Sequence, residues 1–201
     1  MPEITGIIRR RGEAVITLSD GGTVRVPSAM TAHFGLMKGL DIDPQALLQR
    51  LERESMPFAL AEVVKLQARR DHSAGELTTA LREKGYPEQT AAGAVEQLTA
   101  AGIVDDQRFG EILVHRRQRQ RGRAALRQEM RSKGLDPETI EHSLAGLDED
   151  TEYGAAAARA RKMAQRGVED RKIAAALQRR GYSRPVVIRV LGEIGREPEE
   201  E

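Results

Sequence analysis

Apolar side chains recur along most of this chain with the period of an α-helix, and one arrangement of them occurs three times. Segments 76–86, 125–135 and 172–182 superimpose, each with apolar residues eight and four positions before a glycine and another directly after it. Such a glycine supplies the left-handed residue that ends a helix, and the apolar side chain after it folds back onto that helix. The glycines are Gly85, Gly134 and Gly181. Helix start signals follow each glycine, and a further helical pattern precedes each segment, so the sequence predicts three repeats of three helices.

The N-terminal stretch follows a different pattern. Segments 4–10, 14–18 and 23–26 carry β-branched side chains, and a turn-forming sequence separates the last two. A small antiparallel β segment is therefore expected, followed by a helix that begins at Asp43-Pro44. The predicted fold is mainly α, a tandem array of three three-helix repeats with this small N-terminal antiparallel β segment. The expected parts are a β extension with a linking helix (1–55), repeats at 56–104, 105–149 and 150–196, and an acidic, disordered tail (197–201).

Composition narrows the chemistry. The 201 residues include no cysteine, which excludes disulfides, thiolate chemistry and cysteine-bound metals and suits a reducing cytoplasm. No apolar stretch approaches the ~18–20 residues of a membrane span, and the N-terminus has no signal-peptide core. The histidines are scattered, and neither a phosphate-binding glycine loop nor a nucleophile motif occurs. We therefore expect a cytoplasmic protein that is not an enzyme, with no metal, no cofactor and no membrane contact.

A net charge of +1 conceals strongly basic segments. Residues 108–133 hold nine lysines and arginines against two acids, and the third repeat is also basic. A charge run is usually a solvated helix face, but here acids are too few for ion pairs along the helix to neutralise it. Arginine also binds phosphate and carboxylate with two parallel hydrogen bonds, so the pattern favours a polyanionic partner. The candidate contact residues are Arg116, Arg117, Arg119, Arg121, Arg123, Arg127, Arg131 and Lys133 in the second repeat, and Arg161, Lys162, Arg179 and Arg180 in the third.

Two further features allow both a functional and a structural interpretation. Asp105 and Asp106 are a carboxylate pair of the kind used in acid–base or metal chemistry, but they also suit a helix N-terminus, anchored by Phe109. The structural interpretation is favoured, because no histidine or second acidic cluster lies at ligand spacing. Tyr86 and Tyr182 are candidates for stacking on bases. A leucine holds the equivalent position in the second repeat, which favours packing instead.

The segment that links the first two repeats carries a recognisable order of motifs. The sequence 102–109 reads Gly-Ile-Val-Asp-Asp-Gln-Arg-Phe, and it is followed by an arginine-rich helix, Arg121-Gly122, and a helix ending in Lys133-Gly134. This order resembles the central signature of the RecX family, and the resemblance extends over roughly residues 57–194. The departures are small: Gly110 stands where an alanine is expected, and Leu135 replaces a more usual isoleucine.

The resemblance implies three three-helix repeats in a curved array and a specific partner. Members of this family bind the RecA recombinase filament on single-stranded DNA and dampen its ATP hydrolysis, strand exchange and coprotease functions. The chain is therefore expected to regulate homologous recombination, DNA repair and the SOS response. Its expected partners are the RecA filament and, weakly and without sequence preference, single-stranded DNA. We expect a monomer. The β segment is similar to an extension found on longer members of the family.

Two rival functions remain open from the residues alone. Three-helix units can resemble helix-turn-helix domains, so an autonomous DNA-binding module is the main alternative, and it predicts tight binding to naked duplex DNA. A structural scaffold is the other alternative, since helical repeat arrays often bind proteins. It predicts a protein partner and no salt-dependent contact with DNA.

Overall fold

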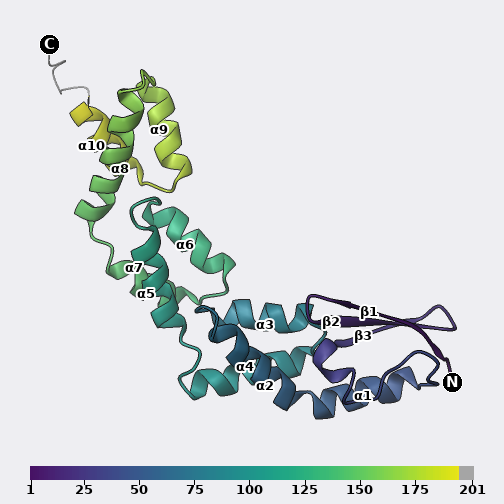
Figure 1. Cartoon of the computed structure of the whole chain (residues 1–201). Helices are drawn as coiled ribbons and strands as arrows, with labels where there is room; N and C mark the ends of the chain where they lie inside the picture. The colour runs from purple at the N-terminus through teal and green to yellow at the C-terminus, as the bar shows by residue number, and fades with distance from the viewer. Residues whose placement is uncertain (195–201) are drawn as a thin grey trace. The chain divides into compact units, whose positions relative to one another are not determined.

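The computed structural model describes residues 1–194, which contain ten α-helices, a short 3-10 helix and a three-stranded sheet (Figure 1). The chain divides into two compact units, the first spanning Met1–Asp105 and the second beginning at Asp106. The mainly α fold with three helical repeats and a small N-terminal antiparallel sheet is confirmed. The acidic segment 197–201, which we expected to be disordered, lies outside the described residues.

The first unit opens with an antiparallel sheet of β1 (Ile4–Arg10), β2 (Glu13–Leu18) and β3 (Thr23–Pro27), in the order β1-β2-β3. Alternation places Ala14, Ile16 and Leu18 of the central strand on one buried face, because successive side chains of a strand point to opposite sides. A 3-10 helix, η1 (Ser28–Met30), follows the sheet.

Four helices complete the first unit: α1 (Pro44–Glu54), α2 (Met56–Gln67), α3 (Ala74–Glu83) and α4 (Glu88–Ala100). The helix that we expected to begin at Asp43-Pro44 does begin there. Asp43 accepts a hydrogen bond from the Gln45 amide ahead of α1. Ser73 and Glu76 form a reciprocal capping box at the start of α3.

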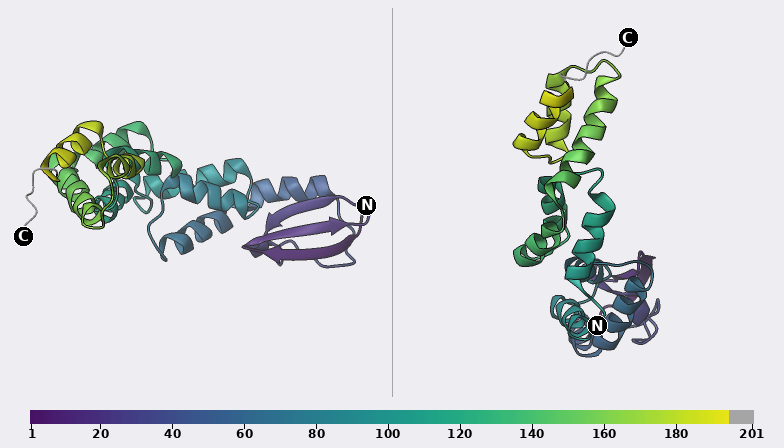
Figure 2. Two further views of the ribbon diagram at one scale, coloured as in Figure 1. Left: turned by 90° about the horizontal axis from the view of Figure 1, so that it is seen from above. Right: turned by 90° about the vertical axis from the view of Figure 1, so that its left-hand side faces the viewer.

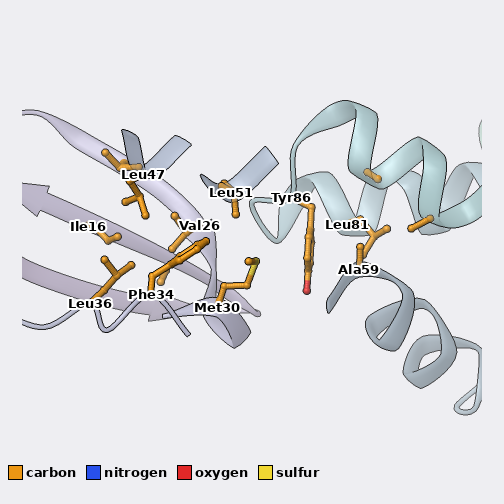
Figure 3. Close-up of a cluster of buried hydrophobic side chains, with 14 of the residues drawn as sticks. Ile16, Val26, Met30, Phe34, Leu36, Leu47, Leu51, Ala59, Leu81 and Tyr86 are labelled. Atoms are coloured by element: carbon orange, nitrogen blue, oxygen red, sulfur yellow. The ribbon is translucent and has the colours of Figure 1, made fainter. Parts of the chain in front are cut away.

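One continuous hydrophobic core joins the sheet to these helices. Figure 3 shows the Tyr86 ring standing between Met30 on the side of the sheet and Leu81 and Ala59 on the side of the helices. Burial of the Tyr86 side chain, with a smaller contribution from the charge of Glu62, raises the pKa of its phenol to about 12. The extension therefore shares its interior with the first repeat.

The second unit consists of two successive three-helix repeats, seen from two sides in Figure 2. The first comprises α5 (Asp106–Arg117), α6 (Arg123–Ser132) and α7 (Pro137–Ala145). The second comprises α8 (Glu149–Ala164), α9 (Asp170–Arg179) and α10 (Arg184–Ile194). Each repeat has its own apolar cluster, one around Leu126 and Met130 and the other around Ile173 and Leu177. The two repeats thus have separate hydrophobic cores, and they contact each other at a junction.

The repeated glycines end α3, α6 and α9 as the sequence predicts. Their φ angles are +87°, +81° and +84° for Gly85, Gly134 and Gly181. In each turn the residue after the glycine donates its amide to a carbonyl five positions earlier, at 3.2–3.3 Å, and the glycine amide bonds to the carbonyl three positions earlier. This is the Schellman geometry. The residues that follow the glycines are all buried: Tyr86, Leu135 and Tyr182. Packing at the turn, and not stacking on bases, is therefore their role.

Candidate functional site

The junction between the second and third repeats is built from direct backbone contact. The Gly122 amide donates to the Arg180 carbonyl at 2.9 Å, and the Ala124 amide donates to the Gly181 carbonyl at 3.1 Å. A Cβ atom on Gly122 would lie 2.4 Å from the Gly181 carbonyl oxygen, and one on Gly181 would lie 2.2 Å from the Ala125 nitrogen. Only glycine permits this approach at both positions. The turn that ends α9 is therefore docked on the start of α6.

A buried carboxylate stabilises the same junction. Glu152 of α8 is 5% exposed, and it accepts a hydrogen bond of 2.9 Å from the Arg123 amide at the first position of α6. The Arg123 guanidinium donates in turn to the Leu147 carbonyl. A carboxylate at a helix N-terminus satisfies a free amide and interacts favourably with the helix dipole. The residue before α6 is Gly122, which has no side chain for this task, so the acceptor comes from the next repeat.

Two adjoining hollows lie beside this contact. The first, of about 390 Å³, is lined by Arg121, Arg159, Ala176, Arg179 and Arg180. The second, of about 720 Å³, is lined by Arg121, Ala124, Ala125, Gln128, Glu129, Ser132, Lys133, Gln178, Arg179 and Gly181. Because Arg121 and Arg179 line both, the two hollows form one continuous surface. We call this surface the arginine groove.

Among the described residues, Glu129 is the one acid that lines the arginine groove. Its carboxylate is shared between Arg121, with an Nε–oxygen distance of 3.5 Å, and Arg117, at 3.7 Å. Arg180 donates to the Gln120 carbonyl at 3.2 Å, and the buried Nε of Arg159 has no hydrogen-bond partner within residues 1–194. Five basic residues and one carboxylate therefore line the groove, and the electrostatic potential of the groove is strongly positive.

The structure separates the remaining sequence candidates from this groove. Arg127 forms a two-bond ion pair with Glu141, at 2.8 and 3.0 Å, and this pair lowers the pKa of the Glu141 carboxyl. Arg123 is committed to the Leu147 carbonyl. The other six residues are exposed on the second unit but do not line either hollow: Arg116, Arg117, Arg119, Arg131, Arg161 and Lys162.

The groove thus unites members of both predicted basic clusters. Arg121 and Lys133 come from the second repeat, and Arg179 and Arg180 come from the third. Arg159, another base of the third repeat, lines the same hollow, although position in a basic helix does not by itself reveal which way a side chain faces. Asp106 begins α5 and Phe109 is buried beneath it, with the Lys133 ammonium 5.7 Å from the ring centre.

Within residues 1–194 no three histidine, aspartate or glutamate side chains gather as a metal site would require. The helices of this part are all too short or too polar to cross a membrane. The geometry of the groove is suited to binding an anion.

Comparison with family models identifies the first two repeats. A model described as the first three-helix domain of RecX matches residues 59–98, and one described as the second three-helix domain matches residues 105–144. These ranges contain parts of α2–α4 and α5–α7, respectively.

Curated relatives and solved structures agree with these matches. Regulatory protein RecX of Mycobacterium ulcerans is 37% identical over 148 residues, which cover 69% of this chain and 84% of the relative. The protein of that name from Mycolicibacterium vanbaalenii is 34% identical over 74% of this chain and 88% of its own. A crystal structure of regulatory protein RecX aligns over 94% of this chain and 98% of its own, with a TM-score of 0.63 and 21% identity. RecX from Lactobacillus salivarius aligns over 71% and 98%, with a TM-score of 0.65 and 16% identity.

Proposed function

Because the chain belongs to the RecX family, we propose that it binds the RecA filament on single-stranded DNA and inhibits the ATPase, strand-exchange and coprotease activities of RecA. Through this inhibition it modulates recombination, DNA repair and the SOS response. The observation that best supports the proposal is the arginine groove, which places cationic side chains of two consecutive repeats on one surface. A nucleoprotein filament is a repeating polyanion, and such a surface matches it in charge.

The proposed mechanism is restraint. Hydrolysis and strand exchange require neighbouring protomers of the filament to move relative to each other. A protein whose successive repeats contact successive protomers holds those positions, and its separate weak contacts add through avidity. The junction at Gly122 and Gly181 serves this purpose by keeping two repeats in fixed register. We propose that the chain acts in this way as a cytoplasmic monomer, by binding and without catalysis.

The test is the single-strand-dependent ATP hydrolysis of the cognate RecA, with this protein titrated in at substoichiometric amounts. We expect a steep loss of hydrolysis, larger than the loss caused by sequestering the same amount of free DNA. The matched variants are Arg121→Glu with Arg179→Glu, in the groove, and Arg131→Glu with Lys162→Glu, outside it. Both reverse two charges, and only the first pair is expected to weaken inhibition by roughly tenfold or more, the effect of losing charge-assisted contacts.

Two results would refute the proposal. Unchanged hydrolysis at a several-fold excess of protein over RecA would exclude an inhibitor. Tight, sequence-specific binding to naked duplex DNA, together with no effect on hydrolysis, would favour the autonomous helix-turn-helix-like module. Circular dichroism of each variant establishes that helix content is unchanged before its activity is compared.

A further inference from the structure

The arginine groove holds more positive charge than the residues around it neutralise. Four guanidinium groups line the smaller hollow together with one alanine, and no acid among the described residues lines that hollow. The four come from the loop before α6, from α8 and from the end of α9. Like charges this close repel one another, and a carboxylate bound among them relieves the repulsion. The buried Nε of Arg159, which has no hydrogen-bond partner within residues 1–194, is one donor available to such a carboxylate.

The sequence carries a matching negative charge in one short segment. Residues 195–201 read Gly-Arg-Glu-Pro-Glu-Glu-Glu, so that four of the seven are acids. The whole chain has a net charge of +1, and residues 1–194 taken alone are therefore more basic than the chain as a whole. Closely spaced carboxylates are the natural complement of closely spaced guanidinium groups, because each such pair can form two parallel hydrogen bonds.

This acidic segment begins close to the groove. It follows α10, which starts three residues after Gly181 of the docked turn. In the last turn of α10 the Glu193 carboxylate accepts a hydrogen bond from the Tyr153 hydroxyl, which holds that end of the helix against α8. This bond is the main cause that lowers the pKa of the Glu193 carboxyl, and the charge of Arg161 adds to it. Arg161 lies two residues beyond Arg159, so α8 places basic side chains both beside the start of the segment and in the groove.

The segment is also long enough to return to the groove. The 11 residues of α10 rise about 16 Å, at about 1.5 Å per residue, and this is how far the helix carries the chain from the docked turn. Seven further residues span up to about 23–25 Å when extended, at about 3.3–3.6 Å each. Helix α10 packs against both α8 and α9, the helices that supply Arg159 and Arg179. The acids therefore have enough chain to run back beside α10 and reach the hollows.

We propose that segment 195–201 docks in the arginine groove of its own chain and closes it to other anions. Tethering raises the effective concentration of the segment to the millimolar range, so weak surface ion pairs are enough to hold it there. A polyanionic partner must then displace the segment, and its apparent affinity falls in proportion to the fraction of chains whose groove is open. This inhibitory contact goes beyond the proposed function and does not depend on it.

Carbodiimide cross-linking of the full chain tests the contact, because the reagent joins a carboxylate to an amine only where the two groups touch. Arg179→Lys introduces an amine on the wall that the two hollows share. The matched control, Arg131→Lys, makes the same change at an exposed position outside the groove. Both variants keep the positive charge. Mass spectrometry of the digested protein measures how much of each new amine is joined to residues 197–201, with neither RecA nor DNA present.

We expect the cross-link at position 179 to form in at least roughly tenfold higher yield than the one at position 131, because docking keeps the segment in the groove. It should be lost at about 1 M salt, where the screening length is about 3 Å. Equal yields at the two positions, or no cross-link at position 179, would overturn the proposal. A mixture of chains with ordinary and heavy nitrogen identifies the source of the segment. Cross-links found only between differently labelled chains would assign the groove to a second copy and overturn docking within one chain.

Neutralisation of the segment separates the docking from the function proposed above. The neutralised variant replaces four acids with glutamine: Glu197, Glu199, Glu200 and Glu201. It should inhibit RecA hydrolysis at a roughly three- to tenfold lower concentration, because its groove is open in every chain. The same replacements should bring no such gain when they are combined with Arg121→Glu and Arg179→Glu. A gain of equal size in both backgrounds would show general repulsion by the segment and would overturn the proposal. Unchanged inhibition, with the cross-link at position 179 intact, would leave the docking standing and refute the groove as the filament contact.

Discussion

Replacement of Gly181 by alanine tests the junction on which the arginine groove depends. Two separate costs arise at this position. The φ angle of +84° is left-handed, which costs an L-residue about 1–2 kcal/mol. The new Cβ would also lie 2.2 Å from the Ala125 nitrogen and 2.5 Å from its Cβ, and an overpacked contact of this kind costs about 1–3 kcal/mol. The expected loss in the free energy of unfolding is therefore about 2–5 kcal/mol.

Gly167→Ala is the matched control, because it carries only the first cost. Gly167 ends α8 in the same type of turn, with φ of +73°, and a Cβ added there would meet no atom of the described residues within 4 Å. Its replacement should cost about 1–2 kcal/mol. The difference between the two variants, about 1–3 kcal/mol, measures how closely the second and third repeats are packed.

Urea unfolding of the two variants gives the losses in stability, and hydrogen exchange locates them. The Ala124 amide donates across the junction to the Gly181 carbonyl, so its exchange should accelerate in Gly181→Ala by roughly tenfold for each 1.4 kcal/mol lost there. In Gly167→Ala this amide should stay protected relative to the rest of the second unit. Equal stability losses in both variants, with the Ala124 amide unaffected, would show that the repeats are not in the close contact described.

Three further predictions address single groups. Glu152→Ala should lower the free energy of unfolding by about 1–3 kcal/mol, because the Arg123 amide loses its acceptor, and Glu152→Gln should cost less; equal losses in urea unfolding would contradict this role. The pKa of Tyr86, raised from 10.0 to about 12, predicts a contribution to stability that is complete below pH 10 and lost between pH 10 and 12, since the unfolded phenol releases its proton first. Tyr86→Phe should flatten that part of the stability–pH curve, and an unchanged curve would refute the assignment. Arg127→Gln should raise the pKa of Glu141 towards its ordinary value in an NMR titration, and an unmoved pKa would disprove the ion pair in solution.

The sequence predicted the repeats because the signals that define them are local. A glycine with apolar residues four and eight positions before it specifies one helix face and one helix end, whatever surrounds it. The β-branched residues and the turn-forming sequence of the N-terminal stretch are equally local signals, and the sheet formed as expected. The predicted basic helix was less accurate. The arginine-rich helix, α5, ends at Arg117, so that Arg119 and Arg121 lie in the loop before α6.

The site was predicted only in part, because it depends on contacts between distant segments. Nothing in the order of residues indicates that Arg121 faces Arg179, or that Arg159 turns towards both. Glu152 stabilises a helix that begins 29 residues earlier in the chain. The sequence gives one indirect sign of this contact: Gly122, the residue before that helix, has no side chain that could accept a hydrogen bond from its first amides. The density of basic residues in the sequence therefore indicated the region of the site, but the packing of the helices determines which of those residues line the arginine groove.

The docking turn has an implication for how such chains diversify. In the second unit the Gly181 turn rests against the backbone at the start of a helix, whereas in the first unit the equivalent Gly85 turn rests against the backbone of Val26 and Pro27, at the end of a strand. The same glycine turn thus packs against a helix in one case and a strand in the other, because the contact requires only exposed main chain and room for close approach. An ancestral gene could therefore exchange the element before a repeat, helix for sheet, without redesigning the repeat itself.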